Sequence, residues 1–73
     1  MPVININREP VELYKILKFE GLVGTGGEAK LVIDDGLVTV NGQTELRKRK
    51  KIVNGDVIEF NGERYTIELD PAS

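Results

Sequence analysis

Cysteine and histidine are both missing from this sequence of 73 residues. The lack of thiols excludes a disulfide framework and a thiolate metal site. The lack of imidazole removes the commonest metal ligand and general base. Asp34 and Asp35 are adjacent in a predicted helix, so their side chains point in different directions and make a poor shared site for a metal or a proton. We therefore predict that the protein is not an enzyme and has no catalytic residues, no metal site and no cofactor.

Long apolar stretches are also missing. Runs such as residues 31–33 are far too short to cross a bilayer, and the first ten residues lack the pattern of a signal peptide. Hydrophobic residues make up 40 % of the chain and charged residues 30 %, which is typical of a globular domain rather than a disordered chain. We expect one cytoplasmic domain over residues 1–73, with its core in about residues 10–69 and no membrane contact.

Two segments have the apolar spacing of helices. In residues 8–21, Pro10 suits the first turn and Gly21 suits the position just after the end. In residues 25–36, Thr25 and Glu28 fit a capping box, and Gly36 is the expected stop. The inward positions of the two helices, at helical spacing, are Leu13, Ile16 and Leu17 in the first and Ala29, Val32 and Ile33 in the second.

Strands and tight turns are predicted for the rest of the chain. The dipeptide Asn-Gly, which tolerates the positive φ of hairpin turns, occurs at residues 41–42, 54–55 and 61–62. A two-residue turn at 61–62 would pair Phe60 with Glu63, Glu59 with Arg64 and Ile58 with Tyr65, which places opposite charges together on one face. A similar hairpin around 41–42 would place Val38 opposite Glu45, so that register is less well determined. Residues 1–6 are expected to add a strand or arm, and residues 70–73 to form a loose tail. Together these patterns predict an α+β fold with two helices packed on a small, mostly antiparallel sheet.

The segment Gly24–Ala29, "GTGGEA", matches the dinucleotide fingerprint G-x-G-x-x-A. That fingerprint requires a preceding strand and a βαβ unit, whereas a helix is predicted before it here. The simplest interpretation is therefore a turn between two helices. A third interpretation stays open, because amides at a helix N-terminus attract phosphate oxygens.

The basic segment, residues 47–51 ("RKRKK"), holds half of the ten basic residues in a chain whose net charge is −2. Runs of charge are often only solvated loops. However, five contiguous cations repel one another, and their concentration in an otherwise acidic chain points to a polyanion. The charge pattern alone leaves both interpretations open.

The order of the motifs adds a family resemblance. The stretch "EAKLVIDDGLVTVNG" followed by "NGDVI" resembles the S4-type RNA-binding domain, and the whole chain resembles its small bacterial stand-alone members. The resemblance implies RNA held along the two helices and the adjoining loop, with structured ribosomal or transfer RNA as the partner and a ribosome-associated protein as a further one. The residues that it places at the RNA are Lys15, Lys18, Lys30, Arg47, Lys48, Arg49, Lys50 and Lys51. Many members have Ser and Arg at the start of the second helix, where this chain has "TGGE", so we expect the backbone amides of Gly26 and Gly27 to contact the RNA there instead.

Base stacking on aromatic side chains is not expected. The chain has only two Phe and two Tyr, and we assign all four to the core: Tyr14, Phe19, Phe60 and Tyr65. Phosphate contacts would then provide most of the affinity for RNA. Two alternatives remain, namely a protein-interaction adaptor on a ribosome or replication complex, and a DNA-binding protein.

Overall fold

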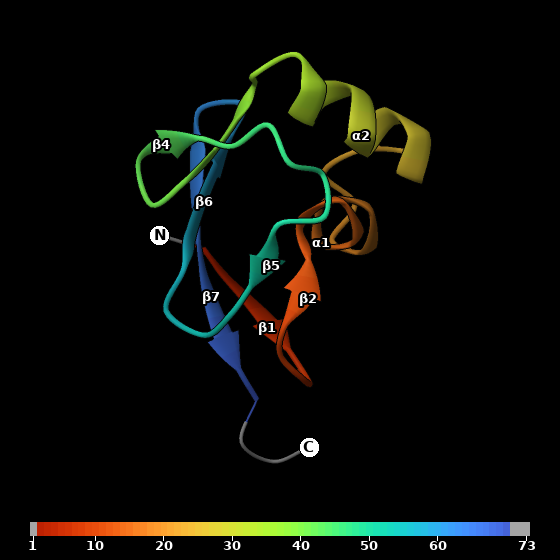
Figure 1. The fold of residues 1–73 in the computed structure, drawn as a ribbon. Coiled ribbons are helices and arrows are strands. Elements are labelled where there is room, and N and C mark those ends of the chain that lie inside the picture. Colours follow the sequence, from red (N-terminus) through yellow and green to blue (C-terminus); the bar gives the residue numbers. More distant parts are fainter. Residues whose placement is uncertain (1, 71–73) are drawn as a thin grey trace.

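The computed structural model describes residues 2–70 and orders two helices and seven strands along them (Figure 1). The elements are β1 (Val3–Ile6), β2 (Val11–Glu12), α1 (Leu13–Phe19), α2 (Gly26–Asp34), β3 (Val38–Val40), β4 (Gln43–Thr44), β5 (Lys51–Ile52), β6 (Val57–Phe60) and β7 (Glu63–Leu69). Five strands form one sheet in the order β1-β7-β6-β3-β4, and β2 and β5 form a separate antiparallel pair. Only β1 runs parallel to its neighbour within the main sheet. Both helices lie on one side of it (Figure 1), which confirms the predicted α+β fold.

The core lies between the helices and the inner face of the sheet. Its buried side chains are all aliphatic: Ile4, Ile6, Leu13, Ile16, Leu17, Ala29, Ile33, Val38, Val40, Ile52, Ile58 and Ile67. The predicted inward positions of both helices are buried, except that Val32 is partly buried against the core. Tyr14, Phe60 and Tyr65 also pack against it. The prediction for Phe19 is wrong, because 69 % of this residue is exposed.

The hairpin predicted around Asn61 and Gly62 is confirmed. Phe60 pairs with Glu63, and the register continues through the two pairs expected on either face. Asn61 has φ 55° and Gly62 has φ 81°, the positive values that a tight hairpin turn requires. The register of the other hairpin is confirmed as well, since the Glu45 N–H donates to the Val38 carbonyl over 3.0 Å.

The start of the first helix was predicted wrongly. Pro10 does not lie in its first turn, because Val11 and Glu12 form β2 and pair with Ile52 and Lys51 of β5. The helix begins at Leu13, after Glu12 in an extended conformation. Pairing with a distant strand has therefore outweighed the local helical pattern. The predicted end is confirmed, since Gly21 follows the helix with φ +72°.

The second helix begins as the capping pattern predicts, with one difference. The Thr25 hydroxyl accepts a hydrogen bond from the Glu28 N–H over 3.0 Å. The Glu28 carboxylate accepts from the Gly24 N–H over 2.6 Å rather than from Thr25 itself. Gly36, with φ +76°, ends the helix as expected.

The two ends of the chain can be followed only in part. The N-terminal strand is confirmed as β1, which pairs in parallel with β7. Of the predicted loose tail, Asp70 is held to β1 by a 2.7 Å hydrogen bond from its N–H to the Ile6 carbonyl. The other tail residues lie outside the described part of the chain.

Candidate nucleic-acid interface

The basic segment is fixed against the start of α1. The Leu13 N–H donates to the Lys50 carbonyl over 2.9 Å, and the Tyr14 N–H donates to the Lys48 carbonyl over 3.1 Å. The first amides of a helix have no partner within the helix, so the segment supplies their acceptors. Lys51 is not in the loop as predicted but in β5, opposite Glu12. The cations are therefore mounted on a backbone that helix and strand pairing hold in place.

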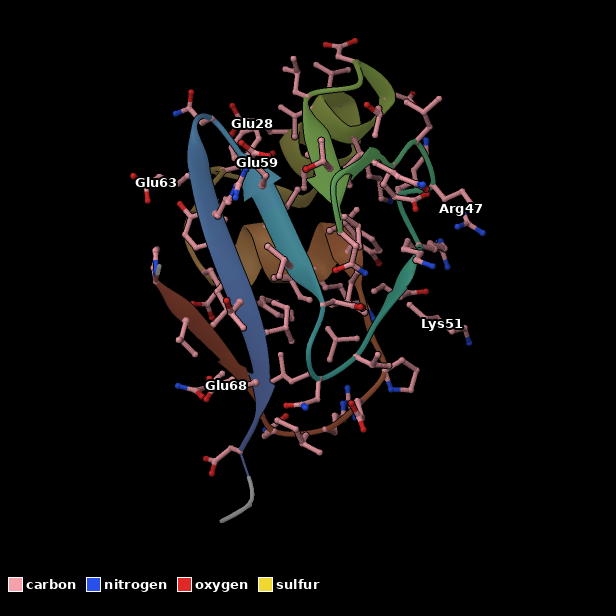
Figure 2. All side chains as sticks on the ribbon, turned by 90° about the vertical axis from the view of Figure 1, so that its left-hand side faces the viewer. Glu28, Arg47, Lys51, Glu59, Glu63 and Glu68 are labelled. Carbon is pink, nitrogen blue, oxygen red and sulfur yellow. The ribbon has the colours of Figure 1, made fainter. Side chains whose placement is uncertain are left out.

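The charges of the two sides of the molecule differ. Arg47 and Lys51 project from the side of the β4–β5 connection, whereas Glu63 and Glu68 lie on the opposite side (Figure 2). The side chains of four cations, Arg47, Arg49, Lys50 and Lys51, line one shallow hollow in the surface. Several cations around one depression concentrate a positive potential there, which suits a phosphate group.

Arg47 is less available for contact with a phosphate than its position suggests, because it is paired with Glu45. Its Nε lies 2.9 Å and its Nη2 3.3 Å from the two carboxylate oxygens of Glu45, and its backbone N–H also donates to this carboxylate. The hydrogen bond from Arg47 holds the pKa of the Glu45 carboxyl below its ordinary value. The same bond raises the pKa of Arg47. Because the Glu45 side chain is only 12 % exposed, this bidentate pair neutralises much of the Arg47 charge.

The other ion pairs around the segment are long and exposed. Lys48 lies 3.9 Å from Asp34 and Arg49 lies 3.9 Å from Glu12, which also holds Lys15 at 3.5 Å. Exposed pairs of this kind contribute only about 0–1 kcal/mol. These cations can therefore exchange a carboxylate for a phosphate at small cost.

The two helices bring further cations to the interface between them. Lys30 of α2 lies over the ring of Tyr14 of α1, with Nζ 4.9 Å from the ring centroid. The aliphatic part of Lys18 lies 3.8 Å from the position that a Cβ on Gly26 would take. The aliphatic chain of Lys18 therefore lies beside the start of α2. The structure thus places all the predicted lysines on the helical pair or the basic segment.

Gly26 and Gly27 form the first turn of α2. The Thr25 hydroxyl accepts from the Glu28 N–H. No acceptor within residues 2–70 pairs with the amides of the two glycines. These amides are therefore free to contact an anion, although the Glu28 carboxylate at the same helix end opposes one. Whether they contact RNA remains a prediction.

Other chemistry finds little support in the described residues. α1 precedes the glycine stretch, and the main sheet is mostly antiparallel, so the βαβ unit of a dinucleotide site is missing there. Residues 2–70 contain no cluster of acidic side chains that could hold a metal ion. None of the helices described is long and apolar enough to cross a bilayer.

Three residues near the interface were not singled out from the sequence as parts of it. Glu12 and Glu45 hold cations of the basic segment, and Phe19 is an exposed aromatic side chain on α1. The spacing of Glu45 and Arg47 was visible in the sequence, but spacing alone does not reveal a bidentate contact. The role of Glu12 could not be predicted from the sequence, because its contact with Arg49 depends on the pairing of β2 with β5.

Sequence comparison finds relatives along almost the whole chain. The family model described as "S4 domain" matches residues 4–68. The Escherichia coli protein named "Putative RNA-binding protein YbcJ" is 43 % identical over 63 residues, which cover 85 % of this chain and 90 % of that protein. The Bacillus subtilis protein named "Probable ribosome maturation protein RlbA" is 34 % identical over 59 residues, which cover 81 % of this chain and 83 % of the relative.

Solved structures agree with the sequence matches. The solution structure of Escherichia coli YbcJ, described as revealing an αL motif involved in RNA binding, has a TM-score of 0.70 and 39 % identity, covering 93 % of this chain and 87 % of that one. The 30S ribosomal protein S4e of Thermoplasma acidophilum has a TM-score of 0.68 and 35 % identity, covering 81 % of this chain and 31 % of that one. Fold, motif order and sequence identity lead to one conclusion: the chain belongs to the S4 domain family.

Proposed function

We propose that this protein binds folded RNA, without catalysis, through phosphate contacts made by the basic segment and the adjoining faces of α1 and α2. The observation that carries the proposal is the attachment of the segment to α1. Two backbone hydrogen bonds and the β2–β5 pair fix the backbone that carries the cations relative to α1. Four of these cations line one hollow in the surface.

Phosphate recognition by fixed cations selects the shape of the nucleic acid. Phosphate contacts carry no base identity, but they set the position and orientation of the partner. Paired RNA offers a regular A-form backbone that proteins recognise through shape, phosphates and 2′-hydroxyls. We therefore propose structured ribosomal or transfer RNA as the partner, in the cytoplasm. The relatives named for RNA binding and for ribosome maturation support this proposal.

The RNA and its class can be tested together. Crosslinking in cells, followed by sequencing of the RNA attached to the protein, should recover folded segments of ribosomal or transfer RNA. In vitro, an RNA hairpin should bind more tightly than a DNA hairpin of the same sequence, because A-form geometry is part of the recognition. Recovery of no RNA above the background of a variant without the basic segment's charges would contradict the proposal. That result would favour the protein-interaction adaptor, and equal binding of both hairpins would favour a general nucleic-acid binder.

A further inference from the structure

A hollow of about 580 Å³ lies between β1 and α1. β1 is an edge strand of the main sheet, so one of its sides has no neighbouring strand. The hollow combines an apolar floor, which includes Ile4 and Ile16, with polar side chains from both elements. Its volume is within the range of small-ligand sites, which run from about 300 to 1,000 Å³.

Phe19 forms part of the wall of this hollow. It is 69 % exposed, although it is the last residue of a helix whose Leu13, Ile16 and Leu17 are buried. The Nζ of Lys18 lies 5.9 Å from the centroid of its ring, so a cation accompanies the aromatic surface. An exposed ring next to a cation can stack on a nucleic-acid base, because every base presents a π-face.

The polar lining is mixed in charge and hydrogen-bonding character. Asn5 and Asn7 bring amides that both donate and accept. Arg8 and Lys15 bring two positive charges, and the carboxylates of Glu20 and Asp70 balance them. A balanced lining does not suit a dense polyanion. It suits a neutral base, whose edge carries donors as well as acceptors.

Two ion pairs of Glu12 connect a residue of the hollow with the basic segment. One carboxylate oxygen of Glu12 lies 3.5 Å from Lys15, which lines the hollow, and the other lies 3.9 Å from Arg49 of the basic segment. An RNA bound to the basic segment would thus have the hollow within reach. A base turned out of the RNA stack at that point would meet the ring of Phe19.

We infer that this hollow binds one unpaired base of the RNA, with Phe19 as the stacking surface and the asparagine amides at the edge of the base. The inference rests on the proposed function, since the phosphates of the same RNA lie on the basic segment. It assigns the protein a preference for RNA helices interrupted by an unpaired nucleotide. Phosphate contacts alone would not produce that preference.

The test uses two RNA hairpins that differ only by a single-nucleotide bulge. The wild type should bind the bulged hairpin more tightly. Phe19→Ala should weaken binding of the bulged hairpin about five- to 150-fold, the equivalent of about 1–3 kcal/mol for one stacked base, and should leave the paired hairpin unaffected. Phe19→Tyr should retain the preference. Leu37→Ala is the matched control, because Leu37 is also an exposed apolar residue, at 55 %, and does not line the hollow.

Each outcome separates the inference from the proposed function. Equal weakening of both hairpins by Phe19→Ala, or no weakening of either, overturns the inference. In the second case the hollow would be left for another partner, such as a peptide along the open edge of β1. A variant in which Ser replaces Arg49, Lys50 and Lys51 together should bind both hairpins more weakly. In that case the proposed function holds, whatever Phe19→Ala does. If the triple variant binds both hairpins normally, the proposed function fails, and the inference fails with it.

Discussion

Arg49 and Arg64 form a matched pair for testing the role of the basic segment. Arg49 is 69 % exposed and lies 3.9 Å from Glu12; Arg64 is 66 % exposed and lies 3.9 Å from Glu59. The two residues therefore match in charge, exposure and ion pairing. They differ in place, because Arg49 belongs to the basic segment and Arg64 lies in β7 of the main sheet. Replacing each by Ser removes the same charge from two different surfaces.

The expected magnitude follows from counterion release. Each phosphate neutralised on B-DNA contributes about 0.9 to the log–log dependence of affinity on salt. Applied to duplex-like RNA, three to five phosphates give a slope between about −2.7 and −4.5. Arg49→Ser should then flatten the slope by about 0.9 and weaken binding about fivefold near 0.15 M salt. Replacing Arg49, Lys50 and Lys51 together should flatten it by about 2.7 and weaken binding about 150-fold.

The assay is fluorescence anisotropy of a labelled RNA hairpin at several salt concentrations, with thermal melts of every variant. Arg64→Ser should leave the slope unchanged. Neither single variant should lose more than about 0.5 kcal/mol of stability, because exposed charges contribute little. Equal slopes for Arg49→Ser and the wild type would refute the assignment of phosphates to the basic segment. Equal losses of RNA affinity in Arg49→Ser and Arg64→Ser would show an effect of net charge rather than of position.

Four further predictions concern single residues. Arg47→Ser should flatten the salt slope less than Arg49→Ser, because Glu45 already holds Arg47. The lowered pKa of Glu45 stabilises the fold above the ordinary glutamate pKa of about 4.3, and this contribution is lost as the pH falls through the folded value. In Arg47→Ser, the stability should fall less between pH 7 and pH 3, because the hydrogen bond that lowers the pKa of Glu45 is gone. Thermal melts over this pH range and an NMR titration of Glu45 would show this. Gly26→Pro removes one amide at the first helical position, which accepts proline, and should weaken RNA binding without unfolding, whereas Gly26→Ala should bind normally in the same anisotropy assay. Gly62→Ala should lower the free energy of unfolding by about 1–2 kcal/mol in denaturant titrations, since its φ of +81° is unfavourable for a side chain.

The sequence was most informative where short-range chemistry decides the structure. The turn at Asn61 and Gly62 fixes the register of its hairpin, because both residues accept positive φ. The hydroxyl of Thr25 and the glycine after each helix acted as their local patterns predicted. The apolar positions of both helices were predictable for the same reason, since helical spacing selects one face.

Long-range pairing explains what the sequence did not reveal. Val11 and Glu12 continue a helical pattern, but their partners in β5 lie some forty residues further along the chain. The pairing of β2 with β5 also brings Glu12 to Arg49 and joins the basic segment to α1. Phe19 was assigned to the core because it is aromatic, yet its position on α1 faces outward. Only the packed arrangement shows that it borders a hollow.

The central claim is tested most directly by mapping the RNA onto the protein by NMR. The backbone amide shifts of the labelled protein would be followed during titration with a folded RNA hairpin. The changes should concentrate in residues 47–51, along α1 and in the first turn of α2. Changes confined to the outer face of the sheet, around Thr39, Val57 and Glu59, or no changes with any folded RNA, would contradict the account.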